Sequence, residues 1–312
     1  MFYEKNRYIS NIHSLKRLEI GRYNIQTYQF QLHIEEEINL QKIFDGGQIF
    51  SWTKYYDGYR GLIDNIPFFI NYKDNILYIK TSIPEEKAKQ KIIHFFDLGI
   101  SVKDIVKKLV STNDQYMLKA VKSNQGLRIL KQEPWICIVS FLCSSVANFN
   151  KISLNIENIS KNLGEKFIFC NQPFYTFPEP KVIAEQSIST LRNYGLGFRS
   201  KYLMDLAYKI TYKGLDIPIL RDYTYNESKN ILKSLYGIGS KIADCVLLYS
   251  LNKNEAFPID RWVQRALRDG YGLDIKNSYN VSSEWARTKW KEHSGYAQQF
   301  LFQYQKELNN EK

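Results

Sequence analysis

Two ionisable side chains in the last third of the chain have types and positions that suit chemistry at carbon. Lys241 falls in the first turn of a predicted helix, where the helix dipole disfavours a cation. A purely structural lysine would be poorly placed there, whereas a lysine whose amine is partly neutral and attacks carbon would be well placed. Asp260 opens a further predicted helix, 261–268, whose first amides can hold a carboxylate facing a developing cation.

The segment before Lys241 has the pattern of a helical hairpin that binds phosphate. The apolar, helix-compatible run 231–235 stops at Gly237 and Gly239, and a second helix then begins. Glycines allow the positive φ angles and close backbone approach that such a turn needs, and free amides at a helix start bind phosphate. Lysine, aspartate and hairpin together predict chemistry on a sugar of a nucleic-acid backbone.

Residues 235–245, followed by Phe257-Pro258-Ile259-Asp260, resemble the helix-hairpin-helix motif of the base-excision DNA glycosylases. The ordered set of Lys241, Cys245 one turn later, and Pro-Ile-Asp is most similar to the 8-oxoguanine DNA glycosylases. The resemblance implies that the enzyme flips the damaged nucleotide out of the duplex and that Lys241 attacks the sugar C1′. Asp260 would stabilise the positive charge, and the resulting Schiff base would allow strand cleavage by β-elimination. No cofactor and no catalytic metal are implied.

Two distant segments supply the base pocket that this resemblance implies. Residues 45–52, Asp-Gly-Gly-Gln-Ile-Phe-Ser-Trp, are similar to a family element whose glycine carbonyl accepts a hydrogen bond from N7–H, which 8-oxoguanine has and guanine lacks. Gly47 is the matching position. In a C-terminal helix, 295–307, Phe302 would stack on the flipped base and Gln298 would bond its Watson–Crick edge, with Cys245 on the other side. From residue types alone, Phe302 would be a core aromatic, Gln298 a surface residue and Cys245 plain core.

The segment 144–152 departs from the family pattern where it should contact the opposite strand. The family carries three asparagines after the serines and then an arginine, which fill the gap left by the flipped base and read the opposite cytosine. Here only the third asparagine is matched, by Asn148, while Val146 and Lys151 replace the first asparagine and the arginine. Valine cannot hydrogen-bond to the orphan base and lysine lacks the planar fork of arginine. The sequence therefore leaves the opposite-base preference open.

A glycine-rich segment, 194–202, resembles the family element that lies beside the opposite base. Phe198 occupies the place of an aromatic wedge, and Arg199 that of an arginine that contacts cytosine. From the residues alone, a tight helix–helix turn with a packed phenylalanine is an equally good interpretation.

Composition points to a nucleic-acid partner and to an intracellular protein. Among 312 residues, 43 Lys and Arg oppose 32 Asp and Glu, a net charge of +11. The four cysteines show no paired CxxC spacing, and no long uncharged apolar run crosses the chain. We therefore expect a soluble, DNA-associated monomer with no membrane contact, whose partner is double-stranded DNA containing oxidised guanine.

The hydrophobic pattern predicts an α+β fold. Residues 1–82 are rich in β-branched and aromatic runs, such as 23–34, 67–72 and 75–79, which predict an antiparallel sheet. From Pro84 onward the period becomes helical, with helices predicted at 85–98, 102–110 and 136–143. We predict two domains, a β-rich one over 1–100 that contributes Gly47, and a helical one over 101–312 that contains the helix-hairpin-helix motif.

Two other functions remain open at this point. One is a glycosylase for another damaged base, either an alkylated purine or an oxidised pyrimidine. The other is a non-catalytic helix-hairpin-helix module that binds duplex DNA. A binding module needs neither Lys241 nor Asp260, and Gly47, Gln298 and Phe302 favour 8-oxoguanine.

Overall fold

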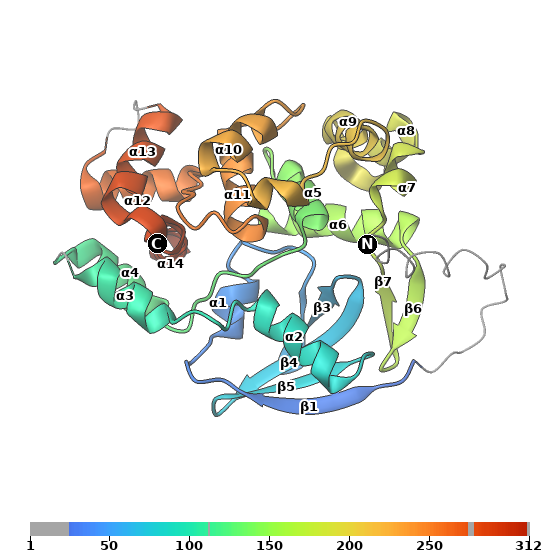
Figure 1. The fold of residues 1–312 in the computed structure, drawn as a ribbon, viewed down its shortest axis with the longest axis horizontal. Helices are drawn as coiled ribbons and strands as arrows, with labels where there is room; N and C mark the ends of the chain where they lie inside the picture. The colour runs from blue at the N-terminus through green and yellow to red at the C-terminus, as the bar shows by residue number, and fades with distance from the viewer. Residues whose placement is uncertain (1–24, 112, 274–277, 311–312) are drawn as a thin grey trace, which may run out of the picture.

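The chain folds into an antiparallel sheet followed by a largely helical region, in a computed structural model that describes residues 25–111, 113–273 and 278–310 (Figure 1). The strands of the sheet are β1 (Tyr28–His33), β2 (Thr53–Tyr55), β3 (Gly58–Ile63), β4 (Ile66–Lys73) and β5 (Ile76–Thr81). Their spatial order is β1-β5-β4-β3-β2, and every neighbouring pair is antiparallel. The predicted α+β fold class is confirmed. The predicted strand 23–34 begins outside the described residues, and its described part contains β1.

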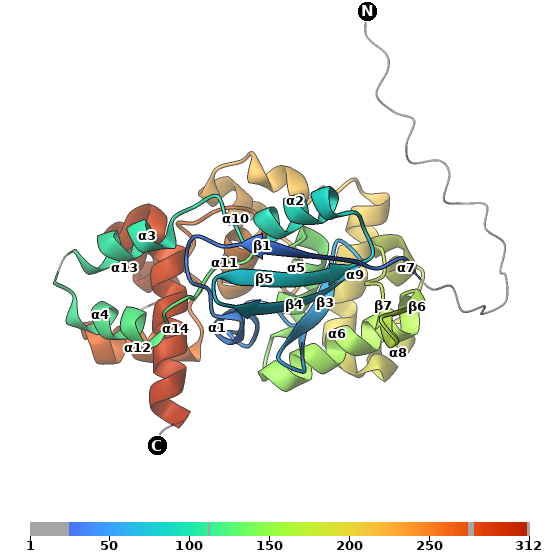
Figure 2. The same cartoon turned by 90° about the horizontal axis from the view of Figure 1, so that it is seen from below.

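Period-two alternation gives the sheet one buried face. In β5, Leu77, Ile79 and Thr81 are buried while Tyr78 and Lys80 point outward. Helix α2 (Glu85–Phe95) covers the buried face with an apolar side that includes Ile92 and Phe95 (Figure 2). The sheet and this helix thus build a core of their own.

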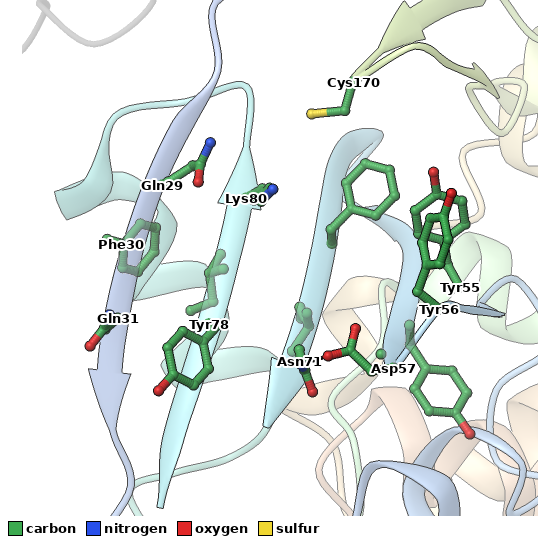
Figure 3. Close-up of a pocket in the computed structure, with 15 residues that line it drawn as sticks. Gln29, Phe30, Gln31, Tyr55, Tyr56, Asp57, Asn71, Tyr78, Lys80 and Cys170 are labelled. Carbon is green, nitrogen blue, oxygen red and sulfur yellow. Dashed lines mark hydrogen bonds between the residues drawn. The ribbon is translucent and has the colours of Figure 1, made fainter. Parts of the chain in front are cut away.

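The opposite face of the sheet is an open hollow of about 580 Å³. Figure 3 shows side chains from several strands along it, among them Gln31, Tyr78 and Asn71, with Cys170 at one end. None of the predicted site residues lines this hollow.

The helical region surrounds a second, larger core. Its helices are α3 (Val102–Val110), α4 (Gln115–Ser123), α5 (Pro134–Cys143), α6 (Phe149–Leu163), α7 (Pro180–Ala184), α8 (Ile188–Leu191), α9 (Arg199–Tyr212), α10 (Tyr225–Lys233), α11 (Ser240–Ser250), α12 (Arg261–Tyr271), α13 (Tyr279–Trp290) and α14 (Ser294–Asn310). Short turns η1 (Arg192–Leu196), η2 (Pro218–Arg221) and η3 (Lys291–His293) join some of them, and a two-stranded hairpin of β6 (Lys166–Phe169) and β7 (Gln172–Tyr175) follows α6.

Two elements differ from the sequence prediction. Helix α1 (Leu40–Phe44) interrupts the region that was expected to be all strands, because Asn39 caps it by accepting from the amide of Lys42 at 3.0 Å. The hairpin β6–β7 lies within the region expected to be helical, and Phe169 stacks on Phe69 of the sheet, with ring centroids 5.8 Å apart. The proposed domain boundary at residue 100 stays a prediction. Phe50 packs in the helical core and Leu130 in the core of the sheet.

Candidate active site

The hairpin before Lys241 forms as the glycine pattern predicts, with one difference. Gly237 has a φ of +84°, and a Cβ there would lie 2.4 Å from the ring of Tyr202, so this position needs glycine. Gly239 has an extended backbone, with φ −89°, and serves as the N-cap of α11. Its α-carbon faces open space, since a Cβ there would meet nothing within 4 Å. The first amides of α11 thus follow directly on a turn that leaves room for a phosphate.

Helix α11 presents Lys241, Cys245 and Tyr249 at a spacing of four residues, which places them on one side of the helix. The half-buried Lys241 reaches back to α5, where its Nζ donates to Ser144 Oγ at 2.9 Å and lies 5.3 Å from the ring centre of Phe141. Burial raises the pKa of Cys245 to about 12, although the charge of Lys241 opposes this. The thiol is therefore a wall of the site and not a nucleophile.

Asp260 caps α12, as the sequence predicts. Its Oδ1 accepts from the amides of Trp262 and Val263, both at 2.9 Å. Burial raises the pKa of Asp260, while the two amide bonds and the charge of Lys241 act in the opposite direction. The Asp260 carboxylate is held rigidly and is largely shielded from water. It would therefore strongly stabilise a cation that forms beside it.

The N-terminal region delivers Gly47 to these helices through hydrogen bonds on either side of it. The carbonyl of Gly46 accepts from Gln299 of α14 at 2.8 Å, and that of Gln48 accepts from Gln132 at 2.7 Å. The Gln48 side chain is itself fully buried, and it accepts from the amide of Leu130 at 2.8 Å. Gly47 has a φ of +76°, a conformation that favours glycine.

Helix α14 supplies the remaining wall. Gln298 is 4% exposed, so the expectation from residue types alone, that it lies at the surface, is wrong. Phe302 is half-buried, and its ring edge comes within 3.1 Å of the place that a Cβ on Gly47 would take. Tyr249 donates to Gln299 at 2.6 Å and lies 3.3 Å from the amide oxygen of Gln298. This polar cluster fixes α14 against α11.

These residues meet in one cavity of about 40 Å³. It is lined by Gly47, Phe141, Lys241, Cys245, Tyr249, Pro258, Asp260, Gln298, Gln299 and Phe302. All six residues predicted for catalysis and for the base pocket are therefore brought together, from four separate parts of the chain. The cavity has room for one or two water molecules, so a purine enters only if a wall moves. Phe302, packed against Gly47, is one of these walls.

Sequence reasoning gave no role at this site to Tyr249, Ser144 or Gln299. Tyr249 could have been found, because it continues the four-residue spacing from Lys241 through Cys245. Ser144 and Gln299 have no such signal, since their partners Lys241 and Gly46 are far away in the sequence and only the fold joins them.

The segment 144–148 lies beside the cavity and carries an exposed valine at its centre. Val146 is 95% exposed and has a φ of +51°, which is costly for a β-branched residue. Arg199 is 6% exposed, and its guanidinium donates to the carbonyls of Ser145 at 3.0 Å and Val146 at 3.3 Å. Arg199 thus holds the valine out into solvent in this structure. Its predicted contact with an opposite cytosine stays a prediction.

Asn148 and Lys151 lie at the start of α6. The side chain of Asn148 caps this helix by accepting from the amide of Lys151 at 2.9 Å. The Lys151 side chain lies over Gly195, because a Cβ on that glycine would come within 3.1 Å of its Nζ. Asn148 thus begins α6 two residues after the exposed Val146.

Aromatic contacts join this segment to the hairpin. Phe198 is 49% exposed, and Arg199 lies over its ring at 4.6 Å. The Phe198 ring contacts Tyr202 at 5.9 Å between centroids, and Tyr202 contacts the exposed Tyr236 at 4.6 Å. Aromatic side chains therefore lead from Phe198 to Tyr236 of the hairpin, and Phe198 and Tyr236 are both exposed.

The described residues contain no cluster of three or more His, Cys, Asp or Glu side chains that could hold a metal ion. Across the same residues, no helix has the length and apolar character needed to cross a membrane.

A sheet domain joined to a helix-hairpin-helix unit with a lysine and an aspartate in one cavity defines a DNA glycosylase of the helix-hairpin-helix class. Residues 31–138 match the family model described as 8-oxoguanine DNA glycosylase, N-terminal domain. A solved 8-oxoguanine glycosylase/lyase of Clostridium acetobutylicum, bound to double-stranded DNA with cytosine opposite 8-oxoguanine, is 32% identical, with a TM-score of 0.83, and the match covers 88% of this chain and 93% of that one. The chain belongs to the family of 8-oxoguanine DNA glycosylases/lyases, as the motif resemblance predicted.

Two further relatives are informative. A probable N-glycosylase/DNA lyase of Methanothermobacter thermautotrophicus is 27% identical over 281 residues, covering 81% of this chain and 88% of its own length. The 3-methyladenine DNA glycosylase of Archaeoglobus fulgidus aligns over 89% of this chain and 98% of its own, with a TM-score of 0.73, but is only 17% identical. That second likeness shows the fold alone, so it does not favour an alkylated base as the substrate.

Proposed function

We propose that this protein excises 8-oxoguanine from duplex DNA with Lys241 as the nucleophile and then cleaves the strand. The observation that carries the proposal is the meeting of Lys241, Asp260, Gly47, Gln298 and Phe302 in one cavity. A DNA-binding module would need neither the amine nor the carboxylate. The substrate is in keeping with that of the solved Clostridium acetobutylicum relative.

The reaction begins when the damaged nucleotide leaves the stack and its base enters the cavity. Phe302 swings away from Gly47 to admit the base and then stacks on it, with Cys245 on the other face. The carbonyl of Gly47 accepts a hydrogen bond from N7–H, which only the oxidised base offers. A buried carbonyl left without that donor costs about 1–3 kcal/mol, so this contact favours 8-oxoguanine over guanine.

Chemistry follows at the sugar. The amine nitrogen of Lys241 attacks C1′, the bond from C1′ to N9 breaks, and the departing base takes the electron pair. Asp260 stabilises the positive charge that develops on the sugar. Loss of the amine proton and ring opening give a Schiff base between Lys241 and C1′. Removal of a C2′ proton then expels the 3′ phosphate by β-elimination.

The opposite strand meets the edge that carries Val146, Phe198 and Lys151. Val146 fills the gap left by the flipped base but cannot hydrogen-bond to the base opposite the lesion. Lys151 contacts that opposite base or a phosphate as a point charge. We therefore propose a weak dependence on the opposite base. A DNA-associated protein is supported by its relatives, while an intracellular location and a monomeric state stay predictions.

Borohydride trapping tests the mechanism directly. Wild-type protein is incubated with duplexes that carry 8-oxoguanine opposite each of the four normal bases, and Schiff bases are reduced to stable adducts. We expect adducts with wild type and none with Lys241→Gln. Lys233→Gln, on the exposed end of α10, is the matched control, since it removes the same charge near the hairpin and should trap normally. Base release without an adduct would exclude Lys241 as the nucleophile, and binding without release would leave only a DNA-binding protein.

A further inference from the structure

A fully buried carboxylate lies on the same helix as the proposed nucleophile. Asp244, three residues after Lys241 in α11, is 0% exposed and accepts hydrogen bonds from three side chains. Tyr225 donates to its Oδ1 at 2.8 Å, and Lys229 and Tyr279 donate to its Oδ2 at 2.8 Å and 2.7 Å. Burial raises the pKa of Asp244, against the attraction of Lys229. A group so costly to bury needs these partners.

The hydroxyl of Tyr279 also contacts the loop before α12, whereas the second contact of the Tyr225 hydroxyl is with Lys229, which donates to it at 2.7 Å. The Tyr279 hydroxyl accepts from the backbone amide of Ile259 at 3.2 Å, the residue directly before Asp260. A tyrosine hydroxyl has one proton to donate, and at 2.7 Å that proton belongs to Asp244, which leaves a lone pair for the Ile259 amide. One hydroxyl at the start of α13 therefore bonds both to α11 and to the loop that precedes α12.

This contact joins the two halves of the proposed catalytic pair. Lys241 and Asp244 are fixed relative to each other by the turn of α11. Ile259 and Asp260 are adjacent, and the cap that Asp260 forms on α12 makes their geometry rigid. The path from the amine to the carboxylate thus runs through Asp244, the Tyr279 hydroxyl and the Ile259 amide. Displacing one catalytic group by about 1 Å can lower a rate by about a hundredfold.

We propose that Tyr279 is a positioning residue that sets the distance between Lys241 and Asp260 by bonding to Asp244 and to the Ile259 amide at once. The proposal rests on the proposed function, because the distance matters only if Lys241 and Asp260 are the catalytic pair. Tyr279 itself takes no part in the chemistry. It explains why a charged group is buried in α11 at this point, since a neutral side chain would not hold the hydroxyl as firmly.

Tyr225 provides a matched control. It donates to the same carboxylate at 2.8 Å from α10, and burial beside Asp244 raises the pKa of both hydroxyls. Among the described residues, the contact to the Ile259 amide is made by Tyr279. Tyr225→Phe and Tyr279→Phe therefore each remove one hydrogen bond to Asp244, but only the second releases the loop that carries Asp260.

The experiment compares the single-turnover rate of 8-oxoguanine excision, the dissociation constant for duplex DNA, and the Tm of wild type and both variants, at a temperature well below every Tm. We expect similar decreases in Tm, unchanged DNA binding, and an excision rate about tenfold lower or more in Tyr279→Phe. Tyr225→Phe should stay within about threefold of wild type, because the two hydrogen bonds that it removes, to Asp244 and from Lys229, lie outside the path.

Equal losses of rate in the two variants, or a rate unchanged in Tyr279→Phe, would overturn the coupling. If Tyr279→Phe does not fold, Asp244→Asn tests the same path, because an amide oxygen accepts from the hydroxyl more weakly. It should lower the excision rate without weakening DNA binding, and an unchanged rate would again overturn the proposal. Failure of the proposed function shows separately, as wild-type protein that forms no borohydride adduct.

Discussion

Replacing Gly47 with alanine should separate recognition of the base from chemistry at the sugar. The glycine has a φ of +76°, and a Cβ there would lie 3.1 Å and 3.2 Å from two ring atoms of Phe302. The substitution therefore strains the backbone and presses on the Phe302 ring that lines the cavity. Both effects turn the Gly47 carbonyl away from the place where N7–H of the base would lie.

The expected magnitudes follow from this geometry. A left-handed conformation costs an alanine about 1–2 kcal/mol, so Tm should fall by roughly 2–6 °C. Loss of a hydrogen bond from a buried carbonyl costs about 1–3 kcal/mol, so excision of 8-oxoguanine should slow by roughly 5- to 150-fold. Cleavage at a preformed abasic site should keep its rate, since that substrate has no base to recognise.

The assay measures single-turnover excision of 8-oxoguanine and cleavage of an abasic duplex by the same protein preparations. Gly214→Ala is the matched control, because Gly214 has a φ of +70° and a Cβ there meets nothing within 4 Å. It should lose similar stability and keep both rates. Unchanged excision in Gly47→Ala, or equal loss of excision and abasic cleavage, would refute the proposed contact between this carbonyl and the base.

Three further substitutions test other parts of the site. In wild type, the excision rate should fall at low pH as Asp260 becomes protonated, at a pH above the usual pKa of an aspartate because burial raises the pKa of Asp260. Asp260→Asn should abolish this fall in rate. The raised pKa also means that the ionised group destabilises the fold above that pKa. Asp260→Asn should therefore be more stable than wild type at neutral pH, with the difference vanishing as pH falls, and no gain in thermal unfolding would contradict this. Val146→Asn should raise the preference for cytosine opposite the lesion and increase stability by up to about 1 kcal/mol, since asparagine tolerates a φ of +51° better than valine; equal rates opposite all four bases would count against it. Ser144→Ala removes the acceptor of the Lys241 amine and should slow excision by about two- to tenfold, whereas an unchanged rate would show that Ser144 does not position the lysine.

The sequence by itself determined the local part of the active site. Lys241 and Cys245 are four residues apart, and residues at that spacing lie on the same face of any helix. The glycines before Lys241 favour a tight turn at that position. Asp260 directly before an amphipathic helix predicted a cap, and the structure has that cap. The β-branched and aromatic run 75–79 predicted a strand, and β5 occupies Ile76–Thr81 in the structure.

Only the tertiary structure decided which distant residues complete the site. Glutamine is usually found at the surface, yet Gln298 is buried because α14 packs against α11 and the Gly47 loop. No local sequence pattern predicts the contacts of Ser144 and Tyr279, since hydrogen bonds between remote segments depend on how the helices pack. The small size of the cavity and the exposed Val146 with its positive φ are likewise results of packing. Periodicity determines which face of an element is buried, but the partner that covers it is set by the whole chain.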